Sequence, residues 1–144
     1  MIREAGNNDA PVLGELASRL WPRHSAEEMA AEMLELLKQK DAAAFLAFEE
    51  ETAVGFVQCG LRHDYVEGTS GSPVGYLEGI YVAENSRGRG VAKALLSACE
   101  DWARAMGCTE FASDCELDNA ASLRFHMNVG FREVNRIICF AKKL

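Results

Sequence analysis

The first forty residues predict a short strand, Met1–Ala5, followed by two amphipathic helices. The apolar residues of each helix fall on one face, at the three- and four-residue spacing of a helix. Trp21-Pro22 ends the first helix, because a residue before proline avoids helical backbone angles. The second helix begins at Ser25, and its acidic first turn and basic end suit the helix dipole. The first apolar stripe is Leu13, Leu16 and Leu20, and the second is Met29, Met33 and either Leu36 or Leu37.

The remaining chain alternates between strand-like and helix-like segments. Strands are predicted over Ala43–Glu49, Thr52–Arg62, Val74–Val82, Glu110–Cys115 and Phe131–Phe140, and helices over Val91–Met106 and Asn119–Val129. The order is β-α-α-β-β-β-α-β-α-β, which predicts an α/β fold with a mixed sheet and helices on both faces. A length of 144 residues fits one domain, spanning 1–144.

The charge balance of the chain limits the classes of ligand that it can bind. The chain has 15 Lys and Arg against 22 Asp and Glu, a net charge of −7. Nucleic-acid binding depends on neutralising phosphates, so an acidic domain without a basic stripe is a poor candidate. No apolar run approaches the ~18 residues that span a bilayer, so no membrane partner is expected. An acidic surface serves solubility or attracts a cationic ligand.

Cysteine and histidine patterns predict no metal site. The five cysteines are widely spaced without a CxxC pair, and the three histidines show no HExxH spacing. The N-terminal residues Met1-Ile2-Arg3-Glu4 lack the pattern of a signal peptide. We therefore expect reduced thiols and a cytoplasmic protein.

The segment Arg87-Gly88-Arg89-Gly90-Val91-Ala92 lies between a predicted strand and a predicted helix. Glycines let a ligand approach the backbone, and the amides of a helix start favour an anion such as pyrophosphate. A P-loop would need Gly-Lys-Ser/Thr, and a dinucleotide fingerprint would need glycine where Lys93 stands. The pattern that fits is (Gln/Arg)-x-x-Gly-x-(Gly/Ala); the alternative is a tight turn without a ligand.

Two carboxylates are candidates for chemistry on an amine. Strand alternation predicts that Glu78 shares an otherwise apolar face with Tyr76, Ile80 and Val82. A buried unpaired charge is costly, so Glu78 either pairs with an arginine or sits in a cleft to bind or deprotonate an ammonium group. We favour the cleft. Asp114, at the end of the next strand, is a similar case, with capping of the following turn as the alternative.

The glycine segment and a second motif, Asn119-x-x-Ser122-x-x-Phe125-His126-x-x-x-Gly130-Phe131, resemble the GCN5-related N-acetyltransferase (GNAT) superfamily. The resemblance implies that Asn119 approaches the coenzyme arm. A tyrosine usually stands at the position of His126, where it is often taken as the acid that protonates the departing thiolate. An imidazole can donate a proton near neutral pH. The alternative is that His126 only packs or bonds to backbone.

A narrower resemblance, to the aminoglycoside 6′-N-acetyltransferases, rests on several blocks. These are Leu20-Trp21-Pro22-x-His24, Arg62-His63-Asp64-Tyr65-Val66, Tyr76-Leu77-Glu78-Gly79-Ile80 and Ala112-Ser113-Asp114. It implies substrate contacts at Trp21, His24, Tyr65, Glu78, Asp114 and Asn135. At Asn135 the related enzymes can carry an acidic residue, so the neutral amide here puts one cation contact in doubt. The last predicted strand also lacks a tyrosine that could act as the acid.

The resemblance implies an enzyme that transfers acetyl from acetyl-CoA to the 6′-amine of aminoglycoside antibiotics by direct attack in a ternary complex, which confers resistance. Glu78 would take the amine proton, His126 would be the candidate acid, and a homodimer involving the C-terminal strand is expected. The coenzyme would lie on Ile80, Tyr81, Val82, Ala83, Arg87, Gly88, Arg89, Gly90, Val91, Ala92 and Asn119. The alternatives are a GNAT enzyme for another primary amine, such as a polyamine, a small metabolite or a protein N-terminus, and a non-catalytic coenzyme-A-binding domain.

Overall fold

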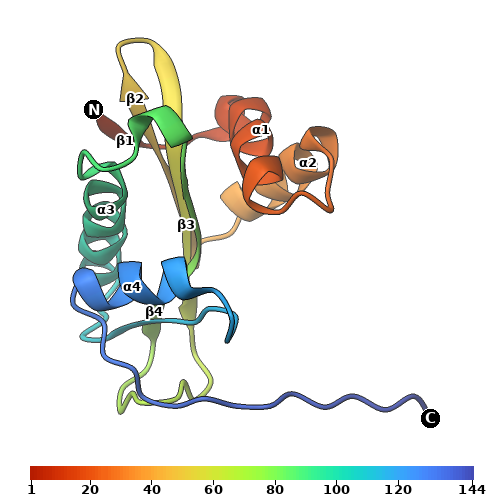
Figure 1. Ribbon diagram of the computed structural model, residues 1–144, viewed down its shortest axis with the longest axis vertical. Helices are drawn as coiled ribbons and strands as arrows, with labels where there is room; N and C mark the ends of the chain where they lie inside the picture. Colours follow the sequence, from red (N-terminus) through yellow and green to blue (C-terminus); the bar gives the residue numbers. More distant parts are fainter.

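A twisted five-stranded sheet in the order β1-β2-β3-β4-β5 forms the centre of the computed structural model, which describes residues 1–144 (Figure 1). Neighbouring strands are antiparallel except for the β4–β5 pair, which is parallel. The strands are β1 (Ile2–Glu4), β2 (Ala42–Glu49), β3 (Thr52–Arg62), β4 (Val74–Val82) and β5 (Phe111–Ser113). The helices are η1 (Asn7–Asp9), α1 (Ala10–Leu20), α2 (Ala26–Leu37), η2 (Glu84–Ser86), α3 (Val91–Ala105) and α4 (Ala120–Asn128). The predicted mixed α/β fold is confirmed.

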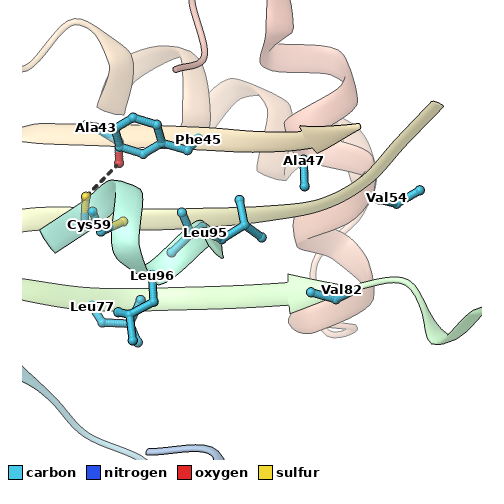
Figure 2. Packing of buried hydrophobic residues seen from close by; sticks show 11 residues of the cluster. Ala43, Phe45, Ala47, Val54, Cys59, Leu77, Val82, Leu95 and Leu96 are labelled. Carbon is cyan, nitrogen blue, oxygen red and sulfur yellow. Dashed lines mark hydrogen bonds between the residues drawn. The ribbon is translucent and has the colours of Figure 1, made fainter. Parts of the chain in front are cut away.

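Helices cover both faces of the sheet, as predicted. Figure 1 shows α1 and α2 on one side and α3 and α4 on the other. Successive residues of β3 bury on opposite sides, because side chains alternate along a strand: Phe56 packs with α1 and α2, whereas Val57 packs with α3. Figure 2 shows the cluster on the α3 side, where Leu95 and Leu96 of α3 meet the sheet. The two clusters thus pack the sheet between the helices on its two faces.

A bulge interrupts β4 in the middle of the strand. Gln58 of β3 pairs with Gly79, and the next residue, Cys59, pairs with Leu77, so Glu78 has no partner. A bulge of this kind adds one residue to one strand and re-aims the side chains on either side of it.

The bulge overturns the predicted alternation along β4. Ile80 and Val82 face the α3 cluster, whereas Tyr81 packs on the α1–α2 side. Glu78 contacts Arg62, which stacks on Tyr76, so Glu78 and Tyr76 do not share a face with Ile80 and Val82. The expectation failed because residues before and after a one-residue bulge exchange faces.

The prediction of a last strand over Phe131–Phe140 is wrong for the single chain. No residue after α4 lies in a strand or helix, and the segment runs away from the body (Figure 1). Phe131 packs beside the α3 cluster, whereas Ile138 and Phe140 are 80% and 90% exposed. The segment has a strand-like pattern, but no strand of its own chain pairs with it. None of the helices combines the length and apolar character that a membrane span requires.

Candidate active site

The segment Arg87–Ala92, named here the glycine loop, connects η2 to α3 with a backbone shape that needs glycine. Gly90 precedes the first residue of α3 at φ +81°, and Gly88 has φ +77°. A Cβ atom at either position would meet nothing within 4 Å, so both glycines border open space. The first amides of α3 have no partner within the helix and lie at its positive dipole end. This geometry fits a pyrophosphate group.

The two arginines of the glycine loop are tied to neighbouring backbone. Arg87 Nε donates to the Val82 carbonyl at 2.7 Å, which anchors the loop to the end of β4. Arg89 Nη2 donates to the Asn85 carbonyl at 2.8 Å, and its Nη1 lies 3.3 Å from Glu49 Oε1. The loop is therefore held by its own side chains, while the space beside Gly88 and Gly90 stays open.

One edge of β4 is free between the middle of the sheet and the glycine loop. The parallel ladder of β4 and β5 ends at the pair Leu77–Ser113. Beyond it β4 stays paired with β3 as far as Val82, but its edge on the β5 side has no partner strand. The predicted coenzyme residues Ile80, Tyr81 and Val82 lie on this part of β4, and Ala83 follows it. An extended ligand can run along this edge from the loop to the end of β5.

Four side chains from β3, β4 and the end of β5 form a connected group, named here the Glu78 cluster: Arg62, Tyr76, Glu78 and Asp114. Arg62 donates from Nε (3.2 Å) and Nη2 (2.7 Å) to the same oxygen of Glu78, and its guanidinium lies 3.8 Å from the Tyr76 ring centroid. The Tyr76 hydroxyl donates a very short hydrogen bond to Asp114 Oδ2. The side chain of Glu78 is 32% exposed.

Burial and hydrogen bonding shift the pKa of two members of the cluster, Tyr76 and Arg62. Burial, and next its bond to Asp114, raise the pKa of Tyr76 far above the usual range, so its hydroxyl stays a donor. The hydrogen bond to Glu78 raises the pKa of Arg62. Each carboxylate uses one oxygen within the cluster, which leaves Glu78 Oε2 and Asp114 Oδ1 for a cationic ligand.

Glu78 pairs with an arginine, which was the alternative to the favoured prediction, and its side chain is still partly exposed. Its action on an ammonium group stays a prediction. Asp114 is bound by Tyr76, and no capping hydrogen bond from its side chain is formed. The sequence interpretation missed Arg62 and Tyr76 as site residues. The signal was present, because both belong to the blocks that carry the narrower resemblance.

Trp21 lies next to the Glu78 cluster. A Cβ on Gly79 would lie 2.5 Å from the Trp21 ring, so the glycine makes room for the indole beside β4. The ring also meets Phe56 edge-on, at 6.2 Å between centroids. Trp21 therefore forms an aromatic wall beside the residue that follows Glu78.

Three other predicted substrate residues have no hydrogen bond to the cluster. His24 Nδ1 lies 3.3 Å from Glu28 Oε2 in α2. Tyr65, in the segment after β3, is 76% exposed. Asn135 lies in the C-terminal segment, where its side chain accepts from the Arg136 amide. The structure brings Trp21, Glu78 and Asp114 together and leaves these three at the surface.

The motif of α4 contains two polar anchors. Asn119 caps the helix by accepting from the Ser122 amide at 3.1 Å. His126 Nδ1 lies 2.7 Å from the Ser122 carbonyl oxygen, and Nε2 lies 2.7 Å from Ser113 Oγ. The ring packs against Phe131, at 5.1 Å between centroids. His126, which was predicted as the acid, therefore bonds both to the backbone of α4 and to Ser113, the last residue of β5.

The chain offers no gathered set of metal ligands. No group of three or more His, Cys, Asp or Glu side chains lies close enough to hold an ion. All five cysteines are free, with Cys59, Cys99 and Cys108 buried. The polar groups gathered at the site are carboxylates, hydroxyls, an imidazole and backbone amides.

Comparison with known proteins agrees with this geometry. The model of the acetyltransferase (GNAT) family matches residues 11–131. The aminoglycoside N(6′)-acetyltransferase type 1 of Acinetobacter haemolyticus is 42% identical over 130 residues, which cover 90% of this chain and 89% of that protein.

Solved structures of aminoglycoside N-acetyltransferase AAC(6′)-Iy are also similar. Its complex with CoA has a TM-score of 0.95 and 38% identity, covering 100% of this chain and 95% of that chain. Its complex with the bisubstrate analogue CoA-S-monomethyl-acetylneamine has a TM-score of 0.94 and 38% identity, covering 100% and 98%. With a glycine loop at the start of α3, a free β4 edge and a family match over most of its length, the chain belongs to the acetyltransferase (GNAT) family.

Proposed function

We propose that this chain is an aminoglycoside 6′-N-acetyltransferase, which transfers acetyl from acetyl-CoA to the 6′-amine of aminoglycoside antibiotics and thereby confers resistance. The observation that carries the proposal is the Glu78 cluster, two carboxylates with free oxygens beside the free edge of β4. Aminoglycosides carry several ammonium groups, and carboxylates bind them with charge-assisted hydrogen bonds. Similarity to N(6′)-acetyltransferases over about nine-tenths of the chain supports the same function.

Acetyl-CoA is the co-substrate of this reaction. The first amides of α3 and the open space beside Gly88 and Gly90 suit its pyrophosphate. The free edge of β4 offers backbone groups to the pantetheine arm. A backbone amide near Ile80 would polarise the thioester carbonyl, because donors aimed at a developing oxyanion stabilise it.

Glu78 is the proposed base and Asp114 the proposed anchor of the amine substrate. Arg62 binds one oxygen of Glu78 and so fixes the orientation of the carboxylate. The other oxygen is then placed to accept the amine proton, directly or through water. Tyr76 fixes Asp114 in the same way. Trp21 supplies an aromatic face next to Gly79, on which a sugar ring or an ammonium group can lie.

Thiol release from acetyl-CoA, measured against a panel of amines, tests the function. The panel holds kanamycin, tobramycin, a polyamine and a peptide with a free N-terminus. The proposal predicts a kcat/KM for the two antibiotics that is far above that for the others. A preference for the polyamine or peptide would favour another GNAT substrate, and acetyl-CoA binding without turnover would indicate a non-catalytic domain.

We further propose a homodimer in which the C-terminal segment of each copy pairs with the other. Ile137, Ile138 and Phe140 are 75% to 90% exposed in a segment with a strand-like pattern and no partner strand in its own chain. A segment of this kind can pair its backbone as an added strand at the sheet edge of a second copy. Sedimentation of the full chain should give a dimer, and the double variant Ile138→Asp/Phe140→Asp should give a monomer. A monomeric full chain would contradict the proposal.

We also infer a cytoplasmic location. Five free cysteines, two of them exposed, support a compartment in which thiols stay reduced. Fractionation of cells that express the chain tests this, since recovery in the periplasmic fraction would contradict it.

A further inference from the structure

We propose that the Ser113 hydroxyl, backed by His126, donates the proton that the coenzyme sulfur takes up as the acetyl group leaves. This inference rests on the proposed function, because it needs acetyl-CoA on the glycine loop and the β4 edge. It makes Ser113 a catalytic residue and His126 a positioning residue that resupplies its proton.

Both ring nitrogens of His126 are already engaged, so the ring acts on a ligand only through a neighbour. Nδ1 faces the Ser122 carbonyl oxygen at 2.7 Å, and because a carbonyl only accepts, Nδ1 carries hydrogen. Nε2 lies 2.7 Å from Ser113 Oγ. Phe125 and Phe131 pack on the ring, with centroids at 5.8 Å and 5.1 Å. A base or acid oriented by a third group, with a hydroxyl in reach, is the arrangement that proton transfer requires.

Ser113 stands where β5 separates from β4. Leu77 and Ser113 form the last pair of the β4–β5 ladder, and beyond it the β5-side edge of β4 is free as far as Val82, while the opposite edge stays paired with β3. The stretch from Glu78 to Val82 spans roughly 13 Å at the rise of a strand, which an extended pantetheine arm covers. A coenzyme whose pyrophosphate lies on the loop therefore brings its sulfur towards Ser113.

Consecutive residues at the end of β5 serve opposite sides of the reaction. Asp114 bonds to Tyr76 in the Glu78 cluster, where the amine is proposed to bind. Ser113 bonds instead to His126 of α4. Successive side chains of a strand point to opposite faces, so the end of β5 separates proton uptake from the amine and proton delivery to the sulfur.

The proton balance is complete with these groups. With the imidazole protonated, Nε2–H donates to Ser113 Oγ, and the serine O–H, whose contacts with the Leu77 and Asp114 carbonyl oxygens are long at 3.5 Å, turns to the sulfur. The amine nitrogen bonds to the acetyl carbonyl carbon, the C–S bond breaks, and its electron pair stays on sulfur. Sulfur takes the Ser113 proton while Oγ takes the Nε2 proton, which leaves neutral His126. The amine proton passes to Glu78, and solvent reprotonates the imidazole.

Ser113→Ala in the full-length enzyme tests the relay, with the exposed α3 substitution Ser97→Ala as a matched control. We expect S113A to lower kcat with kanamycin about a hundredfold, while the Kd of acetyl-CoA, measured by calorimetry, stays within twofold. Ser113→Thr, which restores a hydroxyl, should recover most of the rate. With the acetyl selenoester of coenzyme A, whose selenolate leaves without a proton, S113A should approach the wild-type rate.

His126→Phe keeps the packing against Phe131 and removes the relay, so it tests the proposal even if S113A does not fold. We expect the same loss with acetyl-CoA and the same recovery with the selenoester. Wild-type kcat in both variants, or an equal loss with thioester and selenoester, would overturn the inference while leaving the proposed function intact. A wild-type enzyme that acetylates no amine would overturn both.

Discussion

The glycine loop and the Glu78 cluster lie at the two ends of the free β4 edge and are built in different ways. The loop is a local structure, in which positive φ angles at Gly88 and Gly90 turn the chain into α3 and leave amides exposed. The cluster depends on tertiary contacts, because Arg62 of β3 holds Glu78 of β4 and Tyr76 of β4 holds Asp114 at the end of β5. The first is suited to a group common to a whole family, pyrophosphate, and the second to a particular amine.

Substitutions in the glycine loop and in the Glu78 cluster should affect different substrates. A change in the glycine loop should act on acetyl-CoA alone, because no member of the Glu78 cluster hydrogen-bonds to it. A change in the Glu78 cluster should act on the amine or on turnover and leave acetyl-CoA binding intact. Four substitutions, taken from the largest expected effect to the smallest, test this separation.

Glu78→Gln should have the largest effect. The amide keeps the size of the side chain but cannot accept the amine proton, so we expect kcat to fall by about a hundredfold or more. The KM for acetyl-CoA should stay unchanged. Steady-state kinetics with kanamycin measures both, and Glu35→Gln on the exposed side of α2 is the control. Turnover of E78Q at the wild-type rate would mean that Glu78 serves structure only.

Gly90→Val should weaken acetyl-CoA binding by up to about a hundredfold, because a β-branched residue at φ +81° forces the loop out of its conformation. Gly107→Val is a matched control. Gly107 follows α3 at φ +91° and also has open space around its Cβ, so the backbone strain is similar and the site is remote. Calorimetry on the folded variants should separate them. Equal affinity for acetyl-CoA in both would contradict the assignment of the glycine loop.

Asp114→Asn should raise the KM for the aminoglycoside by about ten- to a hundredfold, since one charge-assisted contact contributes roughly 1.5–3 kcal/mol. The kcat should change less than in E78Q, because the proposed base remains. Asp101→Asn, at an exposed ion pair of α3, is the control. A KM for kanamycin that is unchanged in D114N would remove Asp114 from the substrate site.

Tyr76→Phe should have the smallest effect. It removes the hydroxyl that fixes Asp114 but keeps the ring under Arg62. The loss of one hydrogen bond of about 1 kcal/mol should raise the KM for the antibiotic about fivefold. In the double variant with D114N, the two effects should not add, because Tyr76 acts through Asp114. Additive effects would mean that Tyr76 contacts the substrate independently.

The same contrast explains how much could be predicted from the sequence. The fold and the glycine loop were predictable because they depend on local patterns, such as the helical spacing in α3 and the glycines before it. The face of Glu78 was predicted wrongly because the bulge depends on how β3 and β4 align, which no single strand reveals. Arg62 and Tyr76 were missed because their roles arise only when three strands meet.

The end of the chain shows a further limit of local patterns. Phe131–Phe140 ends in a run of apolar, strand-forming residues, Ile137 to Phe140, but a strand needs a neighbour, and none lies within this chain. For His126, the sequence indicated a candidate acid but not its bonds to Ser113 and the Ser122 carbonyl. These bonds connect residues on β5 and α4, so only the assembled fold brings them together.

The position of acetyl transfer tests the central claim most directly. Kanamycin-type aminoglycosides with a 6′-amine should each be incubated with acetyl-CoA and the enzyme, beside matched analogues that carry a 6′-hydroxyl. The products are then compared by mass spectrometry and NMR. The account predicts a single acetyl group on the 6′-nitrogen of the amines and no product from the hydroxyl analogues. Equal acetylation of both series, or transfer to another amine of the antibiotic, would contradict it.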